Sequence, residues 1–292
     1  ETHATHYCAG CGHGIIHKLI TEALSELGIQ DRTIIINPIG CAVFGYYYWD
    51  CGNIGAAHGR AQAVGTAISR TLRDAIVVAY QGDGDLAAIG FNNTFQAASR
   101  GEHMAVFFVN NAIYGMTGGQ MAPTSLTGMH TMTSPAGRNP LNEGYPVHVC
   151  EVLNQLKAPV YIERVSVADT TRIMRVRQAI RKALQIQREG KGYAFVEFIS
   201  PCPTSVGSDP LKAAAFCIQE MEREFPLGCF RDESATAVPR GPRPAAPTVR
   251  AFFEESGERQ APAVKPDASV GELRLKITGY GGMLFYVVRD TG

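Results

Sequence analysis

The chain has no excess of charge of either sign, because 27 Lys and Arg side chains balance 27 Asp and Glu side chains. A neutral protein offers no net field that attracts nucleic acid or an anionic membrane, so we expect neither as a partner. The sequence also has no apolar run near the roughly 20 residues that span a bilayer and no stretch typical of a signal peptide. We therefore expect a cytoplasmic protein without membrane insertion.

Disulfide bonds are a second expected absence, although the chain has eight cysteines. With 292 residues, 45% of them hydrophobic, the chain can bury one core of ordinary size and carry an appendage. In an α/β chain of this size, a Cys-x-x-Cys pair without a secretion signal is more typical of metal or redox chemistry than of disulfides. The eight are Cys8, Cys11, Cys41, Cys51, Cys150, Cys202, Cys217 and Cys229.

The strongest pattern covers residues 76–117 and alternates strand, glycine turn, helix and strand. One apolar run leads to Gly-Asp-Gly at residues 82–84, and the next ends at Asn-Asn, residues 110–111. Near-continuous apolar runs are typical of parallel strands covered on both faces, so we expect an α/β fold with a mostly parallel sheet and helices on both faces. Both turns then lie at the carboxyl edge, where such folds bind ligands. There Asp83 and Asn111 would offer two hard oxygens to Mg²⁺.

These two motifs, with Asp83 and Asn111 separated by 28 positions, resemble the signature of thiamine diphosphate (ThDP) enzymes. In that signature the Asp, the second Asn and a main-chain oxygen two residues further hold the Mg²⁺ that bridges the diphosphate. The resemblance implies Asp83, Asn111 and the carbonyl of Ile113 as ligands. A Gly-Asp-Gly turn alone is more often an ordinary turn, but the complete spacing favours ThDP.

Four cysteines are expected at the same edge of the sheet. Cys8 and Cys11 lie in a glycine-rich turn before a helix that the apolar spacing predicts over residues 15–27, and Cys41 and Cys202 each follow a predicted strand. A Cys-x-x-Cys turn by itself is also typical of a thioredoxin-like redox pair or half of a zinc site. One close pair with two solitary cysteines fits a 4Fe–4S cluster better than a zinc ribbon, which brings two close pairs.

Two further segments are candidates for the site. His-Gly-Arg from His58 precedes a predicted helix and can offer N–H groups to a phosphate, although a buried core histidine is the commoner role. After Asn111 about 30 residues lack periodicity, and such a segment in a compact domain is usually functional or disordered. Its candidate lining residues are Tyr114, Met116, Thr117 and Gln120.

Residues 7–230 contain seven motifs in this order: CAGCGHG, IGCA, HGR, GDGD, NN, YGMTGGQ and SPCPT. The order and spacing of these motifs resemble those of the β subunit of the 2-oxoacid:ferredoxin oxidoreductases, most closely the 2-oxoglutarate and 2-oxoisovalerate types. The resemblance implies a ThDP-binding fold and CoA-dependent oxidative decarboxylation of a 2-oxoacid to acyl-CoA and CO₂, with electrons passed through a 4Fe–4S cluster to ferredoxin. It implies Cys8, Cys11, Cys41 and Cys202 as cluster ligands, Asp83, Asn111 and Ile113 as Mg²⁺ ligands, and Ile39, Gly40, Cys41, Ala42, His58, Gly82, Gly84, Asp85, Tyr114, Met116 and Thr117 as further cofactor contacts.

One catalytic element is missing from these motifs. ThDP enzymes use a glutamate to activate the aminopyrimidine ring, and no residue here lies in a motif of that kind. In the family this glutamate comes from the α subunit. We therefore expect no certain catalytic residue in this chain, a ThDP pocket that forms at the interface with an α subunit, and γ and δ subunits as further partners.

The composition changes where the motifs end. We expect a ThDP-binding and cluster domain over residues 1–230, a proline-rich linker or arm over 231–270, and a strand-like tail over 271–292. The tail sequence LKITGYGG resembles the opening strand and glycine turn of the family's γ subunit. Since no room remains for another strand and helix, we expect the tail to pair with an element already formed.

Two other functions remain open from the residues alone. A non-oxidative ThDP-dependent lyase or synthase would keep its cysteines as structural residues and would contain no iron. A zinc-stabilised scaffold subunit would contain zinc and no ThDP. The iron, zinc and ThDP contents of the purified protein separate the three functions.

Overall fold

A computed structural model describes residues 5–72, 74–207, 209–239, 272–276 and 284–288. The chain forms two compact units, Glu1–Pro242 and Arg243–Gly292. None of the described helices is long and apolar enough to cross a membrane.

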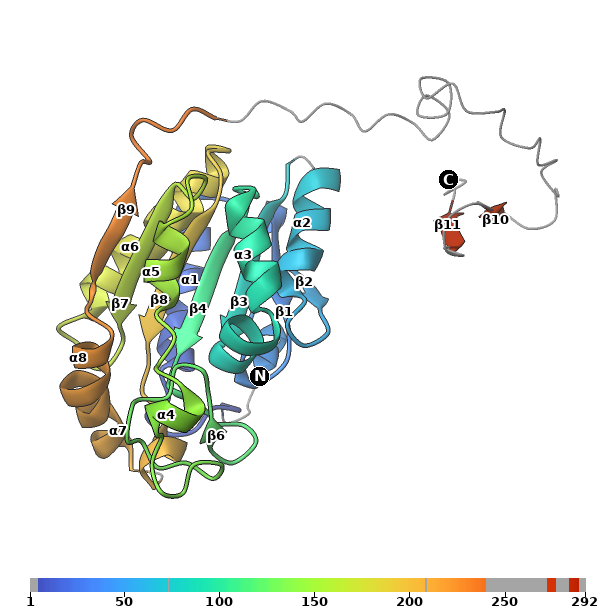
Figure 1. Cartoon of the computed structure of the whole chain (residues 1–292). Coiled ribbons are helices and arrows are strands. Elements are labelled where there is room, and N and C mark those ends of the chain that lie inside the picture. Colours follow the sequence, from blue (N-terminus) through green and yellow to red (C-terminus); the bar gives the residue numbers. More distant parts are fainter. Residues whose placement is uncertain (1–4, 73, 208, 240–271, 277–283, 289–292) are drawn as a thin grey trace. The chain divides into compact units, whose positions relative to one another are not determined.

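The first unit is built on a seven-stranded sheet in the order β2-β1-β3-β4-β8-β7-β9 (Figure 1). All neighbouring strands are parallel except β9, which pairs antiparallel with β7. The central strands β4, β7 and β8 are buried along their whole length, as expected for strands covered on both faces. The strands are β1 (Thr33–Asn37), β2 (Gly52–Gly55), β3 (Ile76–Gly82), β4 (Ala105–Asn110), β7 (Tyr161–Ser166), β8 (Ala194–Ile199) and β9 (Gly228–Asp232). The predicted mostly parallel α/β fold is confirmed.

Helices cover both faces of this sheet (Figure 1). α1 and α6 pack together on one face, and α2, α3 and α5 lie on the other, each layer with its own apolar core. α1 ends before Gly28, whose φ of 62° suits glycine, as the sequence predicts. The helices are α1 (His13–Glu26), α2 (Ala61–Thr71), α3 (Phe91–Ser99), α4 (Pro140–Glu143), α5 (Val149–Asn154), α6 (Ile173–Arg188), α7 (Pro210–Phe216) and α8 (Glu222–Glu224), with a π-helical turn at Gly84–Ile89 and another at Cys217–Met221.

The basic face of α6 is matched by acidic side chains of neighbouring elements. Arg177 lies 2.9 Å from Glu22 of α1, and Arg181 pairs with Glu26 one turn further along the same helix. Lys182 pairs with Asp232 of β9. These pairs join α6 to the elements beside it, so its positive charges do not form an unbalanced patch.

The parallel strands all end at the lower edge of the sheet in Figure 1, where the long loop after β4 gathers with α4 and α7. The hairpin β5 (Ile113–Tyr114) and β6 (Gln120–Met121) begins this loop. The rest is organised around Arg138, which is 4% exposed and donates hydrogen bonds to the carbonyl oxygens of Pro123 (2.9 Å) and Gly144 (2.8 Å). A buried guanidinium therefore gives a stable shape to a segment without periodicity.

The described part of the second unit consists of β10 (Glu272–Lys276) and β11 (Leu284–Val288), which pair antiparallel. The sequence did not predict that these two strands pair with each other, and pairing of the tail with an element formed earlier stays a prediction. Residues 240–271, most of the predicted linker, lie outside the described residues. The domain boundary after residue 230 stays a prediction, although β9 extends across it.

Candidate functional site

Asp83 lies at the carboxyl end of β3 and is almost completely buried, at 4% exposure. Its carboxylate accepts hydrogen bonds from the backbone N–H of Gly84 (3.0 Å) and Ile113 (3.2 Å) and from the hydroxyl of Thr124 (3.3 Å). Burial raises the pKa of this carboxyl to about 7, against the opposing effect of these hydrogen bonds. These three hydrogen-bond donors are neutral, so the buried carboxylate of Asp83 has no positively charged partner within the described residues and can bind a cation.

The turn after β4 brings Asn111 to the same point. The Ile113 N–H lies 3.3 Å from Asn111 Oδ1 and 3.2 Å from Asp83 Oδ2, so one donor joins both oxygens. Between them Ala112 has a φ of 60°, the only positive φ of a non-glycine among the described residues. Two hard oxygens from different strands therefore converge, as the donor set of a Mg²⁺ site requires.

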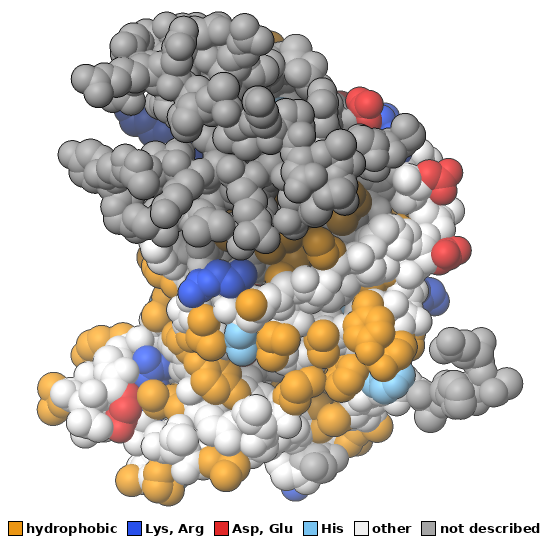
Figure 2. All heavy atoms as spheres, turned by 90° about the vertical axis from the view of Figure 1, so that its right-hand side faces the viewer, with side chains coloured by type: hydrophobic (Ala, Val, Ile, Leu, Met, Phe, Trp, Pro, Cys, Tyr) orange, Lys and Arg blue, Asp and Glu red, His pale blue; other side chains and the backbone are white. Residues whose placement is uncertain are grey.

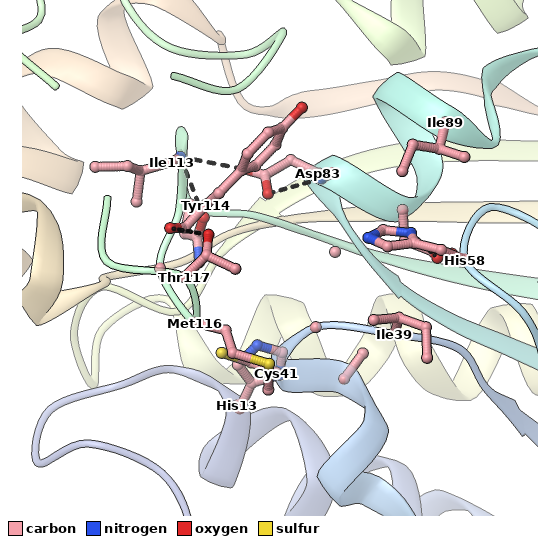
Figure 3. A pocket seen from close by; sticks show the side chains of 17 residues that line it. His13, Ile39, Cys41, His58, Asp83, Ile89, Ile113, Tyr114, Met116 and Thr117 are labelled. Atoms are coloured by element: carbon pink, nitrogen blue, oxygen red, sulfur yellow. Dashed lines mark hydrogen bonds and ion pairs between the residues drawn. The ribbon is translucent and has the colours of Figure 1, made fainter. Parts of the chain in front are cut away.

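A cavity of about 210 Å³ opens beside this turn. Figure 3 shows Asp83, Ile113 and Tyr114 along one side, Ile39, His58 and Ile89 along another, and Met116 reaching toward Cys41. Gly40 and Gly82 face open space, with no atom within 4 Å of where a Cβ would stand. The absence of side chains at these two positions lets a ligand such as a diphosphate approach the backbone closely.

Every residue that the sequence assigns to ThDP or Mg²⁺ lines this cavity, and of the four predicted cluster ligands Cys41 does so as well. Gln120 is the exception among the loop candidates: it does not line the cavity, and its amide donates to the Thr117 carbonyl oxygen at 2.9 Å. Three further residues that the sequence patterns did not indicate also line the cavity: His13, Ile89 and Gly115. His13 lies two residues after Cys11 and was detectable from that position, whereas nothing in the pattern singles out Ile89.

His58 and Asp85 form a pair at the edge of the cavity. His58 Nδ1 lies 2.7 Å from Asp85 Oδ1, which also accepts the Gly59 N–H at 2.6 Å. Asp85 Oδ2 accepts from Gln81 at 2.6 Å. Both carboxylate oxygens of Asp85, a predicted cofactor contact, thus accept hydrogen bonds from this chain. In the structure Asp85 holds the loop that carries His58.

Four cysteines lie near one another at this edge. Burial, together with the smaller effect of nearby Cys202, Cys41 and Cys8, raises the pKa of Cys11 to about 12. Burial likewise raises the pKa of Cys41 to about 11, again with Cys202 and Cys8 as neighbours. Gly115 makes room for Cys202, because a Cβ at Gly115 would lie 2.9 Å from Cys202 Sγ.

The spacing of these thiols does not match a site for one metal ion. Among the described residues, no three His, Cys, Asp or Glu side chains are placed to hold a single ion. A 4Fe–4S cluster has four irons, each bound by a different thiolate, so its ligands do not converge on one atom. The shared neighbourhood of the four cysteines fits a cluster, and the ligand assignment remains a prediction.

Residues 39–198 match the family model described as "Thiamine pyrophosphate enzyme, C-terminal TPP binding domain". The fold and its glycine-lined cavity are therefore those of a ThDP-binding domain. The chain is 58% identical over 286 residues to the ketoisovalerate oxidoreductase subunit VorA of Methanothermobacter thermautotrophicus, and 37% identical over 204 residues to the 2-oxoglutarate synthase subunit KorB of Methanocaldococcus jannaschii. It belongs to the ThDP-binding subunits of the 2-oxoacid:ferredoxin oxidoreductases.

These matches cover different shares of the relatives. The alignment with VorA includes 96% of this chain and 59% of the relative, and that with KorB includes 69% and 70%. A 2-oxoglutarate:ferredoxin oxidoreductase from Magnetococcus marinus, solved with 2-oxoglutarate, coenzyme A and succinyl-CoA bound, has a TM-score of 0.64 at 25% identity and covers 89% of each chain. The chain thus spans less than two thirds of the length of VorA.

Proposed function

We propose that this chain is the ThDP- and cluster-binding part of a CoA-dependent 2-oxoacid:ferredoxin oxidoreductase. The observation that carries the proposal is the placement of a ThDP-type cavity and four neighbouring cysteines at one edge of one sheet. The reaction converts a 2-oxoacid and CoA to acyl-CoA and CO₂, and two electrons leave through a 4Fe–4S cluster to ferredoxin.

The residues of this chain have separate tasks in that reaction. ThDP, when bound, supplies the nucleophilic carbon that attacks the 2-oxo group and accepts the electrons released with CO₂. Asp83, Asn111 and the Ile113 carbonyl would hold Mg²⁺, and Gly40 and Gly82 leave room for the cofactor. Cys41 lines the cavity and also neighbours the other cysteines, so it links the site of decarboxylation to the path of the electrons.

An α subunit would complete this site. Among the described residues no Glu lines the cavity, which supports a partner subunit as the source of the residue that activates the aminopyrimidine ring. Hydrophobic residues around the cavity are exposed, among them Ile39 at 44% and Ile89 at 52%. Figure 2 shows hydrophobic side chains gathered around histidines on the face beside the β2 edge, with few charges among them. Exposed apolar surface around an incomplete site is typical of a surface that a partner covers.

The substrate that we propose is a branched-chain 2-oxoacid such as 2-oxoisovalerate. The identity to VorA is higher than that to KorB. The described residues that line the cavity include apolar Ile39, Ile89 and Met116 and no Lys or Arg to bind a distal carboxylate. An apolar wall accepts a branched alkyl group and leaves a second carboxylate without a charged partner. The second candidate, 2-oxoglutarate, requires a cation from the partner subunit.

The test is anaerobic purification of the chain with its partner subunits, followed by CoA-dependent dye reduction with a panel of 2-oxoacids. We expect the highest kcat/KM with 2-oxoisovalerate, and a preference for 2-oxoglutarate would contradict the substrate proposal. Chemical analysis should find ThDP and about four irons per chain. A colourless, iron-free complex that still decarboxylates would be a non-oxidative enzyme, and zinc without ThDP would indicate a scaffold. The cytoplasmic location stays a prediction.

A further inference from the structure

A network of buried polar side chains lies next to the proposed Mg²⁺ turn without lining the cavity. Its centre is Glu197 of β8, whose register partner on β7 is Arg164. Both side chains are fully buried. A buried ion pair costs desolvation energy and is weak evidence for stability, so its position beside the site calls for another explanation.

The two oxygens of Glu197 have different partners. Oε2 accepts hydrogen bonds from Arg164 Nε at 2.8 Å and from Cys150 Sγ at 3.1 Å. Oε1 accepts the Asn110 Nδ2 amide at 2.8 Å. Arg164 is itself held from the other side by both oxygens of Glu151, at 2.9 and 2.6 Å. Glu197 is therefore held in place by partners on Oε2, and its other oxygen binds Asn110.

Asn110 immediately precedes the proposed ligand Asn111. Since its Nδ2 faces a carboxylate, its Oδ1 points the other way, where it accepts the Ala112 N–H at 3.1 Å. Reversing the amide would place Oδ1 against the Glu197 carboxylate and a donor against the Ala112 N–H. The orientation of Asn110 is thus determined by Glu197.

Ala112 is the strained residue of the turn. A non-glycine residue in the left-handed region is strained and persists only where its surroundings hold it. Two hydrogen bonds do so here: Asn110 Oδ1 binds the Ala112 N–H, and the Ser125 hydroxyl donates to the Ala112 carbonyl oxygen at 2.6 Å. This conformation directs Asn111 and the Ile113 backbone toward Asp83.

We propose that Glu197, held by Arg164, is a positioning residue for the metal site: it orients Asn110, which holds Ala112 in its strained conformation and so aims Asn111 and Ile113 at Mg²⁺. This inference rests on the proposed Mg²⁺–ThDP site. Partners of metal ligands typically contribute about 10- to 100-fold to metal affinity.

The test uses Glu197→Gln in the full chain, copurified with its partner subunits. Arg164 retains the one remaining carbonyl oxygen, because a buried guanidinium requires an acceptor. The new NH₂ group then faces the NH₂ group of Asn110, which must turn and withdraw Oδ1 from the Ala112 N–H. We expect the Mg²⁺ affinity, measured by calorimetric titration of Mg²⁺ at saturating ThDP, to fall about 10- to 100-fold.

Three further variants separate positioning from stability. Asn110→Ala leaves the Glu197–Arg164 pair intact and should lose a similar factor, and the double variant should lose no more than the weaker-binding single variant. Cys150→Ala removes a contact to the other oxygen of Glu197 and should bind Mg²⁺ like the wild type. Wild-type affinity in Glu197→Gln, or an equal loss in Cys150→Ala, would overturn the inference. A wild-type complex that binds ThDP without any dependence on Mg²⁺ overturns the metal site itself.

Discussion

At the scale of single residues, Asp83 is the acidic group on which cofactor retention should depend most. The variant Asp83→Ala removes a buried carboxylate whose hydrogen-bond partners are all neutral. Because no buried ion pair is broken, we expect the fold to persist while Mg²⁺-dependent ThDP retention is lost. Denaturing extraction and quantification of ThDP measure this, with exposed Asp50→Ala as the control. ThDP retained in the Asp83 variant would contradict the ligand assignment.

The cysteines allow a second comparison between single residues. Cys202 neighbours both Cys11 and Cys41, and Cys217, although also near Cys202, is packed in an apolar cluster with Met221 and Phe225. A serine hydroxyl is a much poorer iron ligand than a thiolate, so Cys202→Ser should lower the iron content per chain to well below four. Cys217→Ala should leave it unchanged. Equal iron in the two variants, measured anaerobically, would refute the choice of Cys202.

At the scale of elements, the loop that carries His58 packs backbone to backbone against the turn before α3. Gly59 has a φ of 74°, and a Cβ there would lie 2.7 Å from the Gly90 nitrogen. Gly59→Ala should therefore cost more than the roughly 1–2 kcal/mol of left-handed strain alone and should displace His58 from the cavity. We expect lower stability in a denaturant titration and weaker ThDP binding.

Gly28→Ala is the matched control for this loop. Gly28 has a φ of 62° but no atom within 4 Å of a Cβ, so its substitution costs only about 1–2 kcal/mol of strain and should leave ThDP binding unchanged. If Gly59→Ala and Gly28→Ala lose equal stability, the close backbone contact at Gly59 adds nothing to the cost of the substitution.

Helix α1 should make the fold sensitive to acid through His17. Burial lowers the pKa of His17 to about 2, and its Nδ1 has no hydrogen-bond partner among the described residues. Below the unfolded pKa of roughly 6.5, the unfolded chain binds a proton that the folded chain does not. Stability due to neutral His17 is thus present above that pH and falls by about 1.4 kcal/mol per pH unit below it.

His17→Phe keeps an aromatic ring against Trp49 and removes this titration. Urea titrations at pH 7 and pH 5 should show a smaller loss of stability in His17→Phe than in the wild type. Exposed His130→Gln should lose as much as the wild type. An unchanged loss in His17→Phe would show that His17 does not take up the proton.

At the scale of the whole molecule, the exposed apolar rim of the cavity should determine association with the partner. Ile89 is 52% exposed and lines the cavity, so Ile89→Lys places a charge on the proposed interface. We expect the dissociation constant for the partner subunits to rise about tenfold or more. Leu141→Lys on α4, at a position that is 96% exposed and does not line the cavity, should leave the dissociation constant unchanged. Normal association of both variants would place the interface elsewhere.

Much of this molecule is readable from its sequence because local patterns suffice. Continuous apolar runs mark the central strands, and Gly82, Asp83 and Asn111 mark the turns at their ends because backbone approach and oxygen ligation demand those residue types. Ile89 was missed because an isoleucine near a helix start carries no chemical signal. The pairing of β10 with β11 was missed because strand pairing depends on chain reversal rather than on either strand alone.

The amino-acid order by itself determined the parallel α/β fold, the turn proposed to bind Mg²⁺ and the cysteines that belong to one edge, since each follows from periodicity or from the chemistry of a few adjacent residues. Only the tertiary structure decided what orients them. Glu197 and Arg164 read in the sequence as ordinary charges within strands, yet parallel pairing of β7 and β8 buries them together beside Asn110. The role of a buried charge depends on the groups that pair with it, and those groups come from distant parts of the chain.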